Sequence, residues 1–284
     1  MAELPPTLLD RSARYLTMNM RRLAFLLFLL VAGKLSAQEV KDFGRNRLNS
    51  SPRHGEWVDI NSGDRTIKAF VTYPERKDKA PVVLVIHEIF GLTDWIRSVC
   101  DQLAETGVIA IAPDLLSGQK YEDLDGARKA ISALKKEQVQ ADLDATAAYA
   151  LSRIPAANGT LAVCGFCWGG GWTFTYAAMN PKLKAAYSFY GPAIDNPADA
   201  ARINCPVYGF YAEKDERVDA TIRKAEELMK AAGKKYEPVI YKDAGHGFMR
   251  LGEPDNPQVR DADRKAREEA WARWKRLLTQ PNGA

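Results

Sequence analysis

Apolar runs alternate with helix-like stretches along most of the chain, and their order predicts the class of fold. Residues 81–87 (PVVLVIH) and 108–112 (VIAIA) form nearly continuous apolar runs, which are typical of central strands covered on both faces of a parallel sheet. Residues 94–106 are expected to form a helix that stops at Gly107, because glycine commonly follows the last helical turn. The other expected elements are strands at 56–60, 66–73, 160–164, 184–190, 206–211 and 236–241, and helices at 127–153 (two), 172–179, 219–232 and 256–278.

Strands that alternate with helices predict βαβ units. The expected fold class is therefore α/β, with a mostly parallel central sheet, helices on both of its faces, and a single domain. In an open sheet of this kind the ligand site lies beyond the carboxyl ends of the strands. Residues that directly follow a strand are thus the first candidates for chemistry.

The first 37 residues have the pattern of a secretory signal peptide. Arg21 and Arg22 precede ten uncharged residues at 23–32. That length suits the apolar region of a signal peptide, roughly 7–15 residues, and is short for a bilayer-spanning helix of about 20. Cleavage would follow the small residue Ala37. We expect residues 1–37 to direct export to the periplasm or the medium, with an uncleaved anchor or a buried helix as the alternatives.

The leader suggests a division of the chain into three parts. Residues 1–17 are unusual in front of a signal peptide, so translation is expected to start at Met18 or Met20. Residues 38–54 are polar without a clear period and are expected to form a linker. Residues 55–284 are expected to form the folded domain, and no internal repeat is apparent in them.

Composition narrows the class of protein. The 284 residues are 46% hydrophobic and 27% charged, which is a globular composition and excludes a disordered chain, a fibrous rod and a multi-span membrane protein. The net charge of +4 arises largely in the leader, and the remaining chain has no Lys/Arg-rich run. Nucleic acid is therefore not an expected partner. The sequence leaves the oligomeric state open, with a monomer favoured.

The most specific local signal is the segment 165–169, which reads GFCWG. It lies between a short apolar strand and a helical stretch, and it matches the G-x-nucleophile-x-G turn with Cys167 as the nucleophile. The two glycines allow a tight turn that a side chain would obstruct, and the turn places the sulfur at a helix N-terminus, where thiolate is favoured. The alternative is a glycine-rich packing turn with a buried cysteine.

Two further residues follow in the order that such hydrolases use, which is nucleophile, acid and then histidine. Asp215 comes just after the strand at 206–211, and His246 lies in the loop after the last strand. Of the other two histidines, His54 lies in the polar segment before the domain and His87 lies within a strand pattern. The rivals to Asp215 are Glu213, Glu216 and Asp219.

Four motifs together resemble the dienelactone hydrolase family. They are HEIFGL at 87–92, APDL at 112–115, GFCWGG at 165–170 and AGHGF at 244–248, and the likeness covers roughly residues 55–280. The resemblance implies an α/β-hydrolase fold and a carboxymethylenebutenolidase-like hydrolase, which cleaves a small ester or lactone without a cofactor.

The resemblance also implies a role for individual residues. Cys167 matches the nucleophile, His246 the base and Asp215 the acid that orients it. Glu88 matches a glutamate that contacts the resting cysteine and shifts when substrate binds. The backbone N–H groups of Ile89 and Trp168 would form the oxyanion hole.

Substrate-binding residues are less completely matched. The family's dienelactone enzymes hold a substrate carboxylate with two arginines, and Arg250 stands at the position of one of them. The other position falls in the loop 116–120, which contains no arginine, so Lys120 is the candidate replacement. The side chains expected to wall an apolar acyl pocket, or else to pack in the core, are Phe90, Trp168, Trp172 and Phe248.

Two other classes of function stay open. Cys164 and Cys167 form a C-x-x-C pair, which occurs in thiol-disulfide oxidoreductases. A non-catalytic binding protein of the same fold is the second alternative. The three histidines are dispersed without the spacing of metal ligands, so no metal site is expected.

Overall fold

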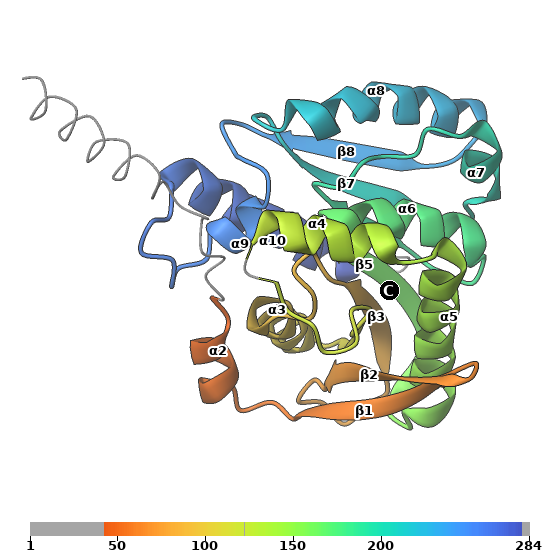
Figure 1. Ribbon diagram of the computed structural model, residues 1–284, viewed down its shortest axis with the longest axis vertical. Helices are drawn as coiled ribbons and strands as arrows, with labels where there is room; N and C mark the ends of the chain where they lie inside the picture. Colours follow the sequence, from red (N-terminus) through yellow and green to blue (C-terminus); the bar gives the residue numbers. More distant parts are fainter. Residues whose placement is uncertain (1–42, 122, 280–284) are drawn as a thin grey trace, which may run out of the picture. The chain divides into compact units, whose positions relative to one another are not determined.

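The computed structural model describes residues 43–121 and 123–279, and an eight-stranded sheet forms its centre (Figure 1). The strand order is β1-β2-β4-β3-β5-β6-β7-β8. β1 pairs with β2 and β2 with β4 in antiparallel fashion, and all other pairs are parallel. The strands are β1 (Gly55–Ser62), β2 (Arg65–Thr72), β3 (Ala80–Ile86), β4 (Ile109–Pro113), β5 (Ala157–Phe166), β6 (Ala186–Phe189), β7 (Val207–Ala212) and β8 (Tyr236–Tyr241).

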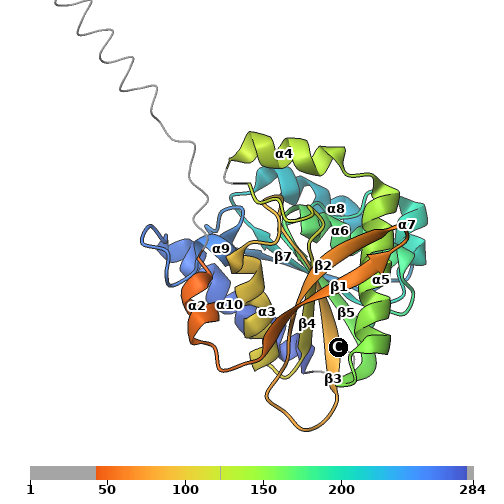
Figure 2. The same cartoon turned by 60° about the horizontal axis from the view of Figure 1, so that its bottom comes forward.

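Helices cover both faces of this sheet, as predicted (Figure 2). The apolar residues of α3 and α10 pack on one face, and those of α5, α6, α7 and α8 pack on the other. The helices are α2 (Arg45–Ser50), α3 (Asp94–Glu105), α4 (Leu124–Ala133), α5 (Lys136–Arg153), α6 (Trp168–Met179), α7 (Pro197–Arg202), α8 (Glu216–Ala231), α9 (Phe248–Leu251) and α10 (Asp261–Leu278).

The central strands are buried on both faces, which explains their continuous apolar runs. In β3 every residue except one is fully buried. On the α10 side, the ring of Phe189 lies 4.2 Å from that of Phe210 and 4.7 Å from that of Trp274. Large rings of this kind bury much apolar area, so this aromatic layer is a main source of stability for the face.

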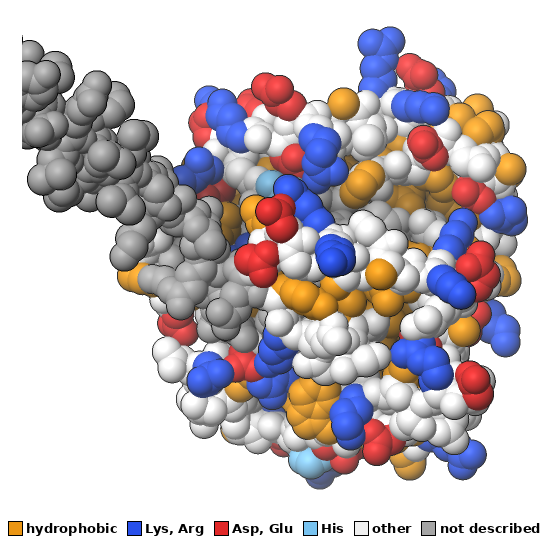
Figure 3. Space-filling view, viewed as in Figure 1, with side chains coloured by type: hydrophobic (Ala, Val, Ile, Leu, Met, Phe, Trp, Pro, Cys, Tyr) orange, Lys and Arg blue, Asp and Glu red, His pale blue; other side chains and the backbone are white. Residues whose placement is uncertain are grey.

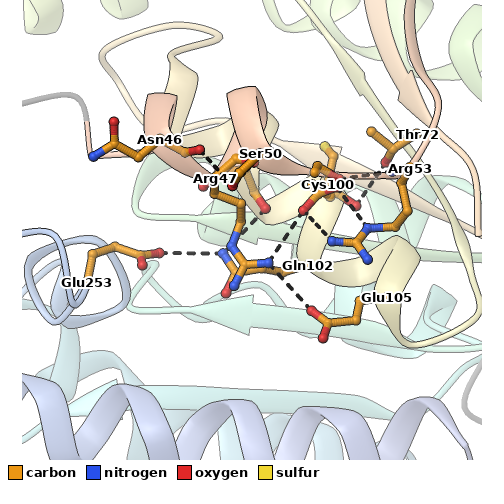
Figure 4. A network of polar contacts seen from close by, with 12 residues as sticks. Asn46, Arg47, Ser50, Arg53, Thr72, Cys100, Gln102, Glu105 and Glu253 are labelled. Carbon is orange, nitrogen blue, oxygen red and sulfur yellow. Dashed lines mark hydrogen bonds and ion pairs between the residues drawn. The ribbon is translucent and has the colours of Figure 1, made fainter.

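Part of the segment expected to be a linker is folded against the domain. Residues 45–50 form α2, and the Arg53 guanidinium after it makes two hydrogen bonds of 2.8 Å to the buried Asp101 carboxylate of α3. Arg47 of α2 also pairs with Asp101 at 3.4 Å, within the polar network of Figure 4. These ion pairs join residues about 50 positions apart, so the local polarity of the segment did not predict them.

Several helices begin at other residues than predicted, and α6 and the last helix differ most. α6 begins at Trp168, where the sequence predicted its start at residue 172. Its glycines weaken the helix locally, but they allow the close packing described below. The last helix begins at Asp261, where residue 256 was predicted. A turn in which the Val259 N–H donates to the Asn256 carbonyl precedes it.

Two observations concern a membrane and the charge of the surface. Over residues 43–121 and 123–279, no helix combines the length and the apolarity that crossing a bilayer requires. Acidic and basic side chains are interspersed over the face shown in Figure 3. The expected signal peptide, residues 1–37, lies outside the described part of the chain.

Candidate active site

Cys167 occupies a strained turn between β5 and α6. Its backbone has φ +56° and ψ −115°, a region that residues other than glycine rarely adopt. A Cβ atom on Gly165 would lie 2.1 Å from the Gly169 carbonyl oxygen, and one on Gly169 would lie 2.3 Å from the Ile86 carbonyl oxygen. Glycine is therefore required on both sides of the cysteine, as the sequence motif predicted.

The turn places the half-buried Cys167 at the N-terminus of α6. Its own N–H donates to the Phe189 carbonyl at 3.0 Å, which fixes the turn to the end of β6. The first N–H groups of a helix have no partner within the helix, and the helix dipole favours negative charge there. The Trp168 N–H, the first of α6, is one such group.

His246 bridges Cys167 and Asp215. Its Nε2 atom lies 3.1 Å from Cys167 Sγ, and its Nδ1 atom is hydrogen-bonded to Asp215 Oδ2. Cys167 follows β5, Asp215 follows β7 at the start of α8, and His246 follows β8. The parallel arrangement of these strands brings together at one sheet edge three residues that span 79 positions of sequence. The structure thus assembles the three residues that the sequence singled out.

The electrostatics of this group favour a charged imidazole. Burial lowers the pKa of His246, but hydrogen bonds to Asp215 and Cys167 outweigh it and raise that pKa to about 10. A protonated His246 next to Cys167 stabilises a thiolate. Among the rivals to Asp215, burial and the neighbouring Asp215 raise the pKa of Asp219 to about 6. The carboxylate of Glu213 instead accepts the backbone N–H of Asp243.

Glu88, the second residue after β3, is paired with Arg250. The Arg250 Nε atom lies 2.9 Å from Glu88 Oε2, and both side chains are largely buried. The Arg250 guanidinium also lies 5.2 Å from the centre of the Phe90 ring, a cation–π distance. The expected resting contact of Glu88 with Cys167 is thus not the one observed among the described residues. A full positive charge compensates a buried carboxylate better than a thiol does, which accounts for the difference.

The turn after β3 lies against the start of α6. A Cβ atom on Gly169 would also come within 2.6 Å of the His87 carbonyl oxygen, so the two backbone segments are in direct contact. The Ile89 N–H belongs to this turn and makes no hydrogen bond to another residue of the described chain. Ile89 and Trp168 therefore offer two uncommitted N–H donors on adjoining turns.

The candidate pocket residues are placed in different ways. The indoles of Trp168 and Trp172 meet edge to face at 5.9 Å and are partly exposed. The Lys120 ammonium group lies 3.5 Å from Asp94 at the start of α3. Phe248 is fully buried and packs on the rings of Tyr190 and Tyr241. Of the two alternatives that the sequence left open for Phe248, a wall of the acyl pocket or packing in the core, the structure therefore has core packing.

Tyr190 belongs to this region and was missed by the sequence analysis. It follows β6 with φ +38°, is fully buried, and its ring meets that of His246 edge to face at 5.2 Å. The available signal was Tyr190-Gly191 directly after a buried strand. Gly191 lies so close to α6 that a Cβ atom there would be 2.2 Å from the Gly171 nitrogen.

The C-x-x-C pair does not have the geometry of a redox site. Cys164 lies inside β5 and is fully buried, and burial raises the pKa of its thiol well above the ordinary value. Both Cys164 and Cys167 are free thiols. A buried thiol of raised pKa is a poor nucleophile for disulfide exchange, so the oxidoreductase alternative gains no support.

The sequence of the chain is similar to a known family and to several of its proteins. The family described as the dienelactone hydrolase family matches residues 67–281. A Methylorubrum extorquens protein named "Putative carboxymethylenebutenolidase" is 37% identical over 206 residues, which are 67% of this chain and 71% of that protein. A Bradyrhizobium protein named "Probable 2-oxo-3-(5-oxofuran-2-ylidene)propanoate lactonase" is 29% identical over 231 residues, 76% of this chain and 90% of its own.

Solved structures agree with the sequence comparison. The crystal structure of a dienelactone hydrolase, named as putative, from Klebsiella pneumoniae has a TM-score of 0.68 and 31% identity, and covers 78% of this chain and 96% of its own. An acylaminoacyl peptidase at 16% identity, covering 84% of this chain and 44% of its own, has a TM-score of 0.67 and shares the fold alone. The predicted fold class, an α/β-hydrolase fold in a single domain, is confirmed.

Proposed function

The chain belongs to the dienelactone hydrolase family of ester and lactone hydrolases, and from this premise we propose that Cys167 is its nucleophile, with His246 as base and Asp215 as the acid that orients it. The observation that supports this most strongly is the distance of 3.1 Å between Cys167 Sγ and His246 Nε2, with Asp215 on the opposite ring nitrogen. The substrate is a small carboxylic ester or lactone.

The reaction proceeds in two stages. The Cys167 sulfur attacks the carbonyl carbon, and the carbonyl oxygen becomes an oxyanion. When that intermediate collapses, the C–O bond to the leaving oxygen breaks and His246 gives this oxygen its proton. Neutral His246 then removes a proton from a water molecule, whose oxygen bonds to the thioester carbon. The C–S bond breaks, the carboxylic acid is released, and the Cys167 thiolate is left beside a protonated His246. In a lactone the leaving oxygen stays attached to the acyl chain as a hydroxyl group.

The Ile89 and Trp168 N–H groups stabilise the oxyanion. Both lie on turns next to Cys167 and are uncommitted in the described chain. Removal of one such donor costs about 3–4 kcal/mol of transition-state stabilisation in other acyl-transfer enzymes. The partly exposed Trp168 and Trp172 indoles provide an apolar wall for the acyl group.

Arg250 binds a carboxylate of the substrate, and Glu88 holds the arginine until substrate arrives. The Glu88–Arg250 pair is largely buried, so an entering carboxylate would replace one anionic partner by another without leaving the guanidinium unpaired. Phe90 supports the guanidinium from its other side. Lys120 has an ion-pair partner in Asp94 and is left as a weaker candidate for this role.

Turnover of p-nitrophenyl acetate and of small lactones tests the proposed function. We expect hydrolysis that iodoacetamide blocks and that Cys167→Ala abolishes. Cys164→Ala is the matched control, because it removes a neighbouring thiol that is fully buried, and it should retain most of the activity. Loss of activity in both variants, together with faster reduction of insulin by dithiothreitol in the presence of the protein, would favour the oxidoreductase function instead.

We also propose that the protein is exported. The support is the sequence pattern of residues 21–37, an arginine pair followed by an apolar run and a small residue. Mass spectrometry of the protein purified from the periplasm or medium should find an N-terminus at Gln38. Recovery of the mature protein from the cytoplasm alone, with residues 21–37 intact, would contradict export.

A further inference from the structure

His87 is fully buried just after β3, and both nitrogen atoms of its ring are hydrogen-bonded. Its Nδ1 atom lies 2.6 Å from the Glu88 carbonyl oxygen, and the Leu115 N–H donates to its Nε2 atom at 3.2 Å. A backbone N–H can only donate, so Nε2 must accept. The hydrogen is then on Nδ1, which donates to the Glu88 carbonyl, and the imidazole is held in one neutral tautomer.

The surroundings of His87 make this arrangement rigid. Its ring stacks on the Trp168 indole with 5.8 Å between the centroids and 27° between the planes. The turn that carries Leu115 is held by its neighbour Asp114. The Asp114 carboxylate accepts the N–H of Gly118 at 2.7 Å, and the Asp114 N–H donates to the Lys68 carbonyl oxygen of β2. Burial lowers the pKa of His87, and protonation of Nε2 would place its hydrogen against the Leu115 N–H.

Because the peptide bond is planar, the hydrogen bond from His87 to the Glu88 carbonyl also orients the Ile89 N–H of the candidate oxyanion hole. The Glu88 C=O and the Ile89 N–H belong to one trans peptide unit, so they point in opposite directions. The Glu88 carbonyl is held by the His87 Nδ1–H and by the N–H of Gly91 at 3.3 Å. The Ile89 N–H is thereby fixed pointing away from the imidazole, and it has no partner in the described chain.

We propose that His87 is a positioning residue for catalysis: its neutral imidazole orients the Glu88–Ile89 peptide so that the Ile89 N–H faces the oxyanion formed at Cys167. This inference rests on the proposed function, because an oxyanion forms only if the chain attacks an acyl substrate. His87 itself contacts neither the substrate nor the sulfur. It acts through the peptide, and its stacking on Trp168 links it to the second donor as well.

Two reactions of the same sulfur separate this role from a general structural one. Hydrolysis of p-nitrophenyl acetate passes through an oxyanion. Alkylation by iodoacetamide does not, because the sulfur attacks a methylene carbon, a C–S bond forms, and iodide leaves with the electrons of the C–I bond. Alkylation therefore measures the reactivity of the Cys167 sulfur without any contribution from the oxyanion donors.

The variants of His87 differ in the hydrogen bonds that the new side chain can make. His87→Leu removes both hydrogen bonds, whereas the glutamine amide of His87→Gln supplies one donor and one acceptor. His54→Leu, at an exposed histidine directly before β1, is the matched control. We expect His87→Leu to lower kcat roughly 10-fold or more, with a smaller change in KM. This threshold is below the roughly 100- to 1000-fold loss known for outright removal of an oxyanion donor, because here the donor is displaced and not removed. Its alkylation rate should stay within about 2-fold of the wild-type rate, and His87→Gln should regain most of the lost kcat.

The outcomes that overturn the proposal are distinct from failure of the proposed function. If kcat and the alkylation rate fall together in His87→Leu, or if kcat does not fall, His87 does not position the oxyanion donor. If the wild-type protein hydrolyses no ester or lactone, the proposed function fails first.

A measurement on the wild-type protein avoids dependence on a folded variant. The ¹⁵N chemical shifts of His87 should report the neutral Nδ1–H tautomer from about pH 5 to pH 9, where an ordinary histidine with a pKa near 6.5 would titrate. A neutral Nε2–H tautomer, or a charged ring in this range, would show that the imidazole does not hold the Glu88 carbonyl as proposed.

Discussion

At the scale of single residues, the site depends on charges that are compensated in pairs. His246 lies between Cys167 and Asp215, and Arg250 is paired with Glu88. Asp215 helps to keep a protonated imidazole beside the sulfur, and Glu88 compensates the largely buried guanidinium of Arg250. Buried charges are stable only with such partners, so removal of Asp215 should change the titration of His246.

The carboxylate of Asp215 should control the titration of His246. Asp215 contributes to raising the pKa of His246 to about 10, so Asp215→Asn should lower the pH at which the imidazole loses its proton. By linkage, the raised pKa stabilises the folded chain below the ordinary value near pH 6.5, and this contribution is lost as the pH rises through about 10. NMR titration of His246 measures the midpoint in both proteins.

Asp219→Asn is the control for this titration, because Asp219 lies near Asp215 without bonding to the imidazole. The His246 midpoint should stay close to the wild-type value in Asp219→Asn and fall clearly in Asp215→Asn. Equal midpoints in the two variants would mean that the hydrogen bond of Asp215 does not hold the proton on the ring.

Glu88 should restrain the reactivity of the resting sulfur. Glu88→Gln removes a negative charge and leaves the Arg250 cation uncompensated, and both effects favour the thiolate of Cys167. We expect iodoacetamide to alkylate the free enzyme several-fold faster in Glu88→Gln near neutral pH. An unchanged rate would end the hypothesis that Glu88 acts as a gate.

At the scale of elements, the site depends on the close approach of α6 to the end of β3. Gly169 allows this approach, because any side chain there would meet the carbonyl oxygens of Ile86 and His87. The same contact brings together the turns that carry Ile89 and Trp168. The glycines that weaken α6 as an isolated helix are thus needed for its packing, and this is why the sequence placed the start of α6 too late.

Gly169→Ala should therefore disrupt both stability and activity. The added Cβ atom meets backbone atoms that cannot move independently, so the free energy of unfolding should fall by about 2 kcal/mol or more. Gly171→Ala is the matched control, since the atoms nearest to its Cβ atom would all belong to Pro192, the ring at 3.3 Å and the carbonyl oxygen at 3.6 Å. Urea unfolding and ester hydrolysis measure the two effects, and equal tolerance of both alanines would contradict the importance of this contact.

At the scale of the whole molecule, the sequence predicted the sheet better than the parts that cover it. Every strand of the described sheet overlaps a predicted strand, because runs such as 81–87 are apolar on both faces and carry their signal locally. The helix α2 was missed because ion pairs with the distant Asp101 hold the segment in place. Short helices such as α7 and α9 have four to six residues, too few to show a periodic pattern.

In the site, too, features with a local sequence signal could be predicted, and features that depend on distant contacts could not. Cys167 and His246 could be found from the sequence because each follows a strand in a recognisable motif. Asp215 could be found because it follows a strand and lies between them in the chain, and parallel strands bring such positions together. The pairing of Glu88 with Arg250, the burial of Phe248 and the position of Tyr190 depend on which side chains meet in three dimensions. A linear pattern does not contain that information.

The central claim is that Cys167 carries the acyl group during turnover. The most direct test is mass spectrometry of the protein quenched in acid during hydrolysis of p-nitrophenyl acetate, with the acetyl group assigned to a peptide. The account predicts one acetyl group per chain, attached as a thioester to Cys167, and slower loss of this group in His246→Gln. Turnover without acylation of Cys167, or an acetyl group on another residue that accumulates and decays at the rate of turnover, would contradict it.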